Sequence, residues 1–271
     1  MPNNLVYIIM DSCRYDSYKA ASTPNMDRLG AGEKRYSFAS WTSPSHFVLL
    51  MGISPHKSPA GVFASEVYKD DFVLWKSRLG VESLDFKSFL PEISLPAKLR
   101  KLGYRNVAKV SLPVLNRFTA FSSHFDDYKL MDNHNDFDGM IKEMTFSPGR
   151  PHFYFFNLGE THYPYMLTRE ETPVLHGVHG VFKHLDEKDE GEVKFFDKER
   201  MEMLRAQQIK CVEYVDGLLP GLYAKCPPDT HIIITADHGE LFGEENYFGH
   251  GPIFHEKVFE VPFLEGIVPK P

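Results

Sequence analysis

The sequence predicts an α/β fold with a doubly wound, mainly parallel sheet flanked by helices. Short apolar segments alternate with segments of helical spacing, and this alternation is typical of parallel sheets. Asp11, His162 and the adjacent Asp237 and His238 each fall just after a predicted strand. Ligands of such sheets bind beyond the carboxyl ends of the strands, so these side chains are expected to share one edge.

Five short segments are the predicted strands. The first is apolar on both faces, as a buried parallel strand would be. The third and fourth are also strong strand candidates, because aromatic and β-branched residues dominate them. The five strands are predicted over residues 5–10, 105–110, 152–157, 230–235 and 258–264.

Five other segments have helical spacing or helix-terminal residues. Thr23 is the expected N-cap of the first helix, with Pro24 in its first turn. Gly52 and Gly103 are expected to end the second and third helices. The helices are predicted over residues 24–29, 43–51, 94–102, 136–144 and 198–219. We expect residues 62–91 to form an insertion or lid, and residues 168–193 to form a mobile loop.

The composition indicates one soluble globular domain over residues 1–271. Hydrophobic residues make up 42% and charged residues 25%, which is ordinary for such a protein. The net charge of -7 argues against a sequence-independent nucleic-acid binder. The three cysteines have no zinc-site or redox-dithiol spacing, and no apolar segment is long enough for a signal sequence or a membrane span. A cytoplasmic location without a membrane partner is therefore expected.

Four side chains could hold a divalent cation together. Asp11 alone could equally cap a helix, but Asp237 and His238 end a strand as adjacent carboxylate and imidazole ligands. Thr42 begins a predicted helix, where backbone N–H groups and the helix dipole favour an anion. Two carboxylates, one imidazole and one hydroxyl suit one Mn²⁺ or Zn²⁺ ion, and suit Mg²⁺ or Ca²⁺ less well.

Residues 40–52 provide the first family resemblance. They read small-x-Thr-Ser-Pro-Ser-His-x-x-Leu-Leu-x-Gly, similar to the sulfatase signature small-x-Cys-x-Pro-Ser-Arg-x-x-Leu-Leu-Thr-Gly. Thr42 stands where sulfatases oxidise Cys or Ser to formylglycine, and His46 stands at the Arg. His46 is equally compatible with a supporting role in the site and with plain packing. A threonine cannot become that aldehyde, so attack by a hydroxyl on a phosphate ester is the expected chemistry.

Further blocks resemble the alkaline phosphatase/sulfatase superfamily in the same order along the chain. They cover nearly all of it, from residue 5 to residue 264. The blocks are Asp11 with Arg14, Thr23–Leu29, His162–Tyr165, Tyr214–Asp216, Asp237–Glu240, Gly249–Gly251 and Val261–Phe263. The resemblance implies an alkaline phosphatase-like core, and the chain stops where the family commonly continues with a C-terminal subdomain.

The resemblance also implies roles for individual residues. Asp11, Thr42, Asp237 and His238 would hold one metal ion, with Thr42 as the nucleophile. His162 and His250 would contact the transferring group, and Arg14 would help to balance substrate charge. Each histidine could instead be a packed structural residue. Ser12 replaces the second Asp of sulfatases, and no Asp-x-x-x-His is present near His162 for a second metal. Glu160, His162 and His250 could form such a second site, but a single metal ion is favoured.

Four functions remain open at this point. The first is a metal-dependent hydrolase of phosphate mono- or diesters that forms a covalent phospho-threonine, and the second is a phosphoryl or phospho-headgroup transferase with the same site. A metal-binding module that has lost turnover and a sulfate-ester hydrolase are the others. The expected partner is a small-molecule phosphate or sulfate ester, and a homo-oligomer or another chain could complete the pocket.

Overall fold

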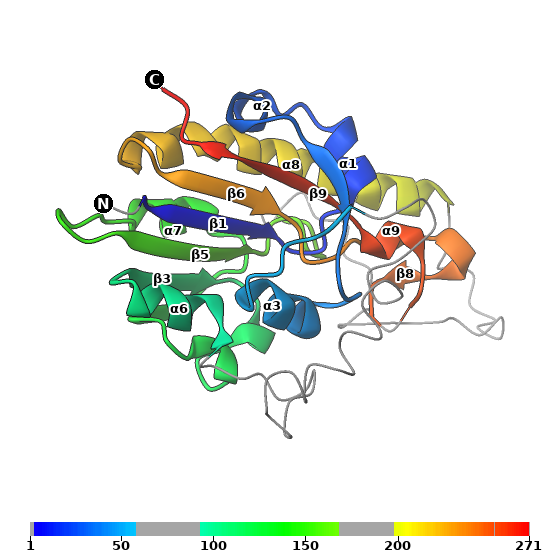
Figure 1. The fold of residues 1–271 in the computed structure, drawn as a ribbon. Helices are drawn as coiled ribbons and strands as arrows, with labels where there is room; N and C mark the ends of the chain where they lie inside the picture. Colours follow the sequence, from blue (N-terminus) through cyan, green and yellow to red (C-terminus); the bar gives the residue numbers. More distant parts are fainter. Residues whose placement is uncertain (1–2, 58–92, 168–197, 252, 271) are drawn as a thin grey trace.

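A seven-stranded mixed sheet forms the centre of the molecule (Figure 1). The computed structural model describes residues 3–57, 93–167, 198–251 and 253–270. The strand order is β2-β9-β6-β1-β5-β3-β4, and β9 alone runs opposite to the other six strands. The predicted mainly parallel sheet is therefore confirmed. The strands are β1 (Leu5–Met10), β2 (Glu33–Tyr36), β3 (Arg105–Val110), β4 (Asp127–Leu130), β5 (His152–Leu158), β6 (His231–Thr235) and β9 (Glu260–Ile267).

Helices cover both faces of this sheet (Figure 1). On β1, alternate side chains point to opposite faces, so Val6 and Ile8 pack in one core, whereas Tyr7 and Ile9 pack in the other. The first core is closed by α1, α2, α7 and α8, and the second by α3 and α6. The helices are α1 (Tyr15–Ala20), α2 (Pro24–Leu29), α3 (Thr42–Leu50), α6 (Leu95–Lys101), α7 (Phe137–Lys142), α8 (Lys198–Lys225) and α9 (Glu256–Phe259).

A short hairpin follows the central strand β6. It pairs β7 (Leu241–Phe242) with β8 (Phe248–Gly249), and its aromatic residues pack on the first turns of α8 through Met201 and Leu204. His250 comes directly after β8. The hairpin therefore returns the chain to the edge of the sheet where β1 and β6 end.

Several elements differ from the sequence-based expectation. Strands β2 and β4, helix α1 and the hairpin were not predicted, because these segments are short or polar and owe their conformation to their neighbours. The last strand begins at Glu260 rather than at residue 258, since the preceding residues form α9. The expected lid over 62–91 and loop over 168–193 lie outside the described residues. No helix in the described part of the chain is long and apolar enough to cross a bilayer.

The capping of α2 also corrects the prediction. Thr23 occupies the N-cap position, but its side chain makes no capping hydrogen bond. The carboxylate of Asp216 on α8 accepts hydrogen bonds from the backbone N–H groups of Asn25 (3.1 Å) and Met26 (2.7 Å) instead. The first turn of α2 is thus satisfied by a residue 190 positions away in sequence.

Candidate metal centre

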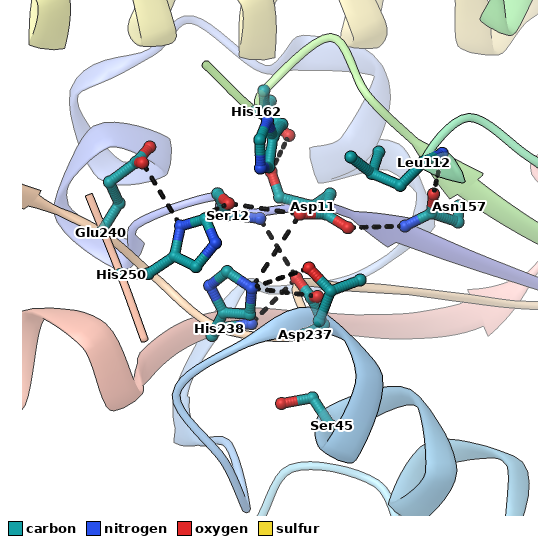
Figure 2. Close-up of polar contacts among 12 residues, drawn as sticks. Asp11, Ser12, Ser45, Leu112, Asn157, His162, Asp237, His238, Glu240 and His250 are labelled. Carbon is teal, nitrogen blue, oxygen red and sulfur yellow. Dashed lines mark hydrogen bonds and ion pairs between the residues drawn. The ribbon is translucent and has the colours of Figure 1, made fainter. Parts of the chain in front are cut away.

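Three predicted ligands meet at one edge of the sheet (Figure 2). Asp11 follows β1, and Asp237 and His238 follow β6, the strand paired with β1. One ligand atom from each of the three residues lies within 4.8 Å of the others, and all three side chains are buried. Asp11, Asp237 and His238 are the only group of this kind found among the described residues.

The tautomer of His238 suits a metal ligand. Its Nδ1 lies 2.8 Å from the carbonyl oxygen of Gly239 and donates to it, so Nε2 carries the lone pair. Burial, and next the neighbouring His250, lower the pKa of His238 well below its ordinary value. The neutral imidazole therefore presents Nε2 to Asp237 Oδ2 at 3.2 Å and to Asp11 Oδ1 at 3.9 Å.

Asp237 supplies the clearest sign that a cation belongs here. Its Oδ1 accepts hydrogen bonds from the backbone N–H groups of Ser12 (3.1 Å) and His238 (3.0 Å). Its Oδ2 is buried and has no hydrogen-bond partner. His46 Nδ1 lies 3.4 Å from this oxygen but donates to the carbonyl of Thr42 at 2.9 Å. An orphaned carboxylate oxygen facing a lone pair is costly without a positive charge, so these residues fit a divalent metal.

Thr42 lies against the same group. It is the first residue of α3, and its Oγ1 is 3.4 Å from His238 Nε2. The side chain is buried, with 6% of the residue exposed. The structure thus brings all four predicted ligands together from β1, β6 and the N-terminus of α3.

The two predicted substrate-binding histidines adjoin this group. The ring centroid of His250 lies 4.3 Å from that of His238 and 5.3 Å from that of His162. Burial opposes a charge on His250, but the hydrogen bond and charge of Glu240 raise the pKa of His250 above its ordinary value. The Nδ1 of His250 is 3.4 Å from both Glu240 Oε2 and Ser12 Oγ (Figure 2). The other oxygen of Glu240 accepts a short hydrogen bond from the hydroxyl of Tyr165.

Arg14 lies in a different set of contacts. Its guanidinium pairs with Asp16 and Glu244, both at 2.6 Å, and stacks near the ring of Phe242. Two carboxylates already balance its charge, so a role toward substrate stays a prediction. Glu160 does not join His162 and His250 either, because its Oε1 accepts the backbone N–H of Phe137 at 2.7 Å.

Two buried residues of this site, Glu240 and Asn157, were not predicted individually from the sequence. Glu240 was noticed only as part of a block, and Asn157 only as the last residue of a strand. Asn157 Nδ2 lies 2.8 Å from Asp11 Oδ2 and 3.2 Å from His46 Nε2. A carboxamide ending an otherwise apolar strand was the available signal. The sequence was equally compatible with a supporting role and with simple packing for His46. In the structure, His46 contacts three residues of the site.

Comparison with known proteins identifies the family. The family model named Sulfatase matches residues 3–264. The chain therefore belongs to the sulfatase family, within the alkaline phosphatase/sulfatase superfamily. A search of curated proteins finds no match to this sequence.

Solved structures share the fold at low sequence identity. The C-terminal periplasmic domain of phosphoethanolamine transferase EptC from Campylobacter jejuni is 13% identical, with a TM-score of 0.60 over 98% of this chain and 80% of that one. The corresponding EptC domain from Escherichia coli, solved in complex with Zn, is 14% identical, with a TM-score of 0.56 over 98% and 73%. Phosphonate monoester hydrolase of Agrobacterium radiobacter is 14% identical, with a TM-score of 0.57 over 97% and 68%.

Proposed function

We propose that the protein is a metal-dependent hydrolase of phosphate esters with Thr42 as its nucleophile. One observation carries the proposal, namely the hydroxyl of Thr42 at 3.4 Å from the Nε2 of His238, within a buried group in which Asp237 Oδ2 has no hydrogen-bond partner. Thr42 stands at the position of the residue that sulfatases convert to an aldehyde, and it supplies a hydroxyl there. A hydroxyl needs no such conversion to attack phosphorus.

The metal centre would use Asp11, Asp237, His238 and Thr42 as its ligands. A bound divalent cation would lower the pKa of the threonine hydroxyl and polarise the ester oxygen. The mixed oxygen and nitrogen set favours Mn²⁺ or Zn²⁺ over Mg²⁺ or Ca²⁺. The EptC domain solved with Zn supports such an ion in this fold.

The other residues of the chain would then perform the transfer. Thr42 Oγ1, whose proton would pass to solvent once the hydroxyl pKa is lowered, attacks phosphorus and forms a covalent phospho-threonine, while the bond to the leaving oxygen breaks. His250 and His162 contact the phosphoryl oxygens, and His250 donates the proton that the leaving oxygen needs. Glu240, itself bonded to Tyr165, holds the His250 ring. Water then attacks the phospho-threonine and gives a proton to the neutral His250, so that phosphate is released and both Thr42 Oγ1 and His250 return to their starting state.

A transferase with the same site is the second candidate. The phosphoethanolamine transferase neighbour favours it, because an alcohol can occupy the position of the attacking water. For either reaction we propose a small-molecule phosphate mono- or diester as substrate, without a nucleic-acid or membrane partner, in a cytoplasmic protein. Sulfate-ester hydrolysis and a metal-binding role without turnover are weaker alternatives.

Metal analysis combined with a substrate panel tests the proposal. The panel contains phosphomonoester, phosphodiester, phosphonate and sulfate-ester substrates, offered to wild type, Thr42→Ala and Thr42→Ser. We expect chelator-sensitive turnover of a phosphate ester, loss of at least about 10³-fold in Thr42→Ala and partial retention in Thr42→Ser. Adding alcohols and analysing products separates transfer from hydrolysis.

Two outcomes would refute the proposed chemistry. Full activity of Thr42→Ala on a phosphate ester would exclude Thr42 as the nucleophile. If only sulfate esters are turned over, the site is that of a sulfate-ester hydrolase. If the protein binds metal but turns over no substrate, it is a metal-binding module.

A further inference from the structure

We infer that Asn157 is a positioning residue that presents Asp11 to the metal and, through His46, also holds the first turn of α3. The inference rests on the proposed metal centre. In it, Asn157 orients a metal ligand without coordinating the metal itself. Asn157 lies near the end of β5, between the proposed metal ligand Asp11, which directly follows β1, and Leu112, just beyond β3 (Figure 2).

The orientation of the Asn157 carboxamide is set by the backbone beyond β3. Its Oδ1 accepts a hydrogen bond from the N–H of Leu112 at 3.2 Å and shares the N–H of Ser111, at 3.2 Å, with the main-chain carbonyl of Asn157, at 3.1 Å. Two backbone donors converge on one atom, so that atom must be the oxygen. The NH₂ group therefore points the other way, toward the site.

The two hydrogens of this NH₂ group reach two different residues. The Nδ2 nitrogen lies 2.8 Å from Asp11 Oδ2 and 3.2 Å from His46 Nε2, so it donates one hydrogen to each. Both oxygens of Asp11 accept a hydrogen bond, Oδ2 from Asn157 and Oδ1 from the hydroxyl of Ser12 at 3.2 Å, and Oδ1 is the oxygen that faces His238 Nε2. Asn157 thus holds the Oδ2 side of the carboxylate, the shorter of the two contacts, and so orients Asp11 with Oδ1 toward His238.

His46 extends the same arrangement to the nucleophile. Its Nε2 accepts from Asn157, so Nδ1 carries the hydrogen and donates to the backbone carbonyl of Thr42 at 2.9 Å. The ring is wholly buried and packs against Phe121 and Phe155, with centroids 5.6 Å and 5.8 Å away. A rigid ring therefore links the Asn157 carboxamide to the residue that carries the hydroxyl.

As a consequence, the positions of two proposed metal ligands, Asp11 and Thr42, both depend on the Asn157 side chain. With all four of its hydrogen-bonding positions engaged, the side chain has a single arrangement. Groups that orient metal ligands in this way change metal affinity when they are removed, typically by 10–100-fold. Asn157 should therefore set metal affinity as well as turnover.

The experiment measures metal affinity directly, by calorimetric titration of metal-free protein with Mn²⁺ and Zn²⁺. The variants are Asn157→Leu, His46→Phe, which keeps an aromatic ring, and the double variant. Asn106→Leu is the matched control, because Asn106 is equally buried and bonds the backbone of Pro96 and His124, near the opposite end of β3. Thermal unfolding of each metal-free variant reports the purely structural cost.

We expect Asn157→Leu to raise the metal Kd by about 10-fold or more, and Asn106→Leu to leave it within about twofold. His46→Phe should weaken metal binding by a smaller factor than Asn157→Leu does. Its effect should be smaller still when Asn157→Leu is already present, because both substitutions break the same contact between Asn157 and His46. Both leucine variants should lose thermal stability.

A metal Kd of Asn157→Leu within about twofold of wild type, an equal loss in Asn106→Leu, or additive effects of the two site substitutions would overturn the inference. If Asn157→Leu does not fold, His46→Phe decides alone, and an unchanged Kd refutes the link. Wild-type protein that binds neither metal would refute the proposed centre itself, together with this inference. Metal binding without phosphate-ester turnover would refute only the proposed reaction.

Discussion

His238 Nε2 lies 3.2 Å from Asp237 Oδ2, although both atoms are hydrogen-bond acceptors. Two buried acceptors at this distance repel each other unless a cation lies near them. We therefore predict that Mn²⁺ or Zn²⁺ stabilises the fold. At a concentration 100 times its Kd, a ligand adds about 2.7 kcal/mol to the free energy of unfolding. The melting temperature should rise by roughly 5–10 °C, measured by calorimetry with and without chelator.

Asp237→Asn is the control for this stabilisation. Its oxygen can keep the two hydrogen bonds from Ser12 and His238, while its NH₂ group replaces the orphaned oxygen. The variant should fold and melt at or above the temperature of metal-free wild type, without a metal-induced rise. A rise equal to that of wild type would contradict the placement of the metal at Asp237.

The pairing of Glu240 with His250 predicts a graded loss of activity. His250→Ala removes the proposed proton donor and should lower turnover by about 10²–10⁴-fold. Tyr165→Phe removes only the hydrogen bond that holds Glu240, so a smaller loss is expected. Steady-state kinetics measure both effects, and titration should show metal affinity near the wild-type value in each variant. Equal losses in the two variants would argue that the site had collapsed as a whole.

The capping of α2 by Asp216 predicts an effect on stability far from the metal. Asp216→Ala removes a buried carboxylate that accepts hydrogen bonds from two backbone N–H groups of the first turn, that of Asn25 shared between both oxygens, and from the Asn25 side chain. Because hydrogen bonds to charged groups contribute about 1.5–3 kcal/mol, we expect a loss of about 2 kcal/mol in urea unfolding. Thr23→Ala should cost less, since Thr23 makes no capping bond. The reverse order would restore Thr23 as the main cap.

Glu160 predicts a dependence of stability on pH. Burial raises the pKa of Glu160 to about 7, and one of its oxygens has no hydrogen-bond partner. Between about pH 4.5 and 7 the folded state keeps this proton, whereas the unfolded chain releases it. This carboxyl therefore contributes stability that is full below about pH 4.5 and is lost as pH rises to about 7, by roughly 3 kcal/mol.

Glu160→Gln isolates this contribution, because the amide is neutral throughout and can still accept from Phe137. Relative to wild type, the variant should gain stability as pH rises from about 4.5 and level off above about 7. Urea unfolding at a series of pH values, with chelator present, measures the difference. A difference that does not change with pH would show that Glu160 titrates normally.

The central part of the fold and the ligands were predictable for the same physical reason. Buried parallel strands are continuous apolar runs, and a charged residue directly after such a run must lie at the sheet edge. Asp11 and Asp237 satisfy this rule, so their proximity followed from topology. The boundaries of β3 agree with the prediction, whereas β2 and β4 escaped it because their four-residue polar segments have little signal of their own.

The sequence by itself determined the α/β class, the family frame and the four candidate ligands, since these depend on local apolar pattern and on motifs contiguous in the chain. Only the tertiary structure showed that Asp216 caps α2, that two carboxylates hold Arg14, and that Asn157 and His46 join Asp11 to Thr42. Most of these contacts, such as those of Asp216 with α2, Arg14 with Glu244 and Asn157 with Asp11, connect residues distant in sequence, and each side chain has several possible partners. The packing of the sheet, with α3 and α8 on its faces, decides which partner each one meets.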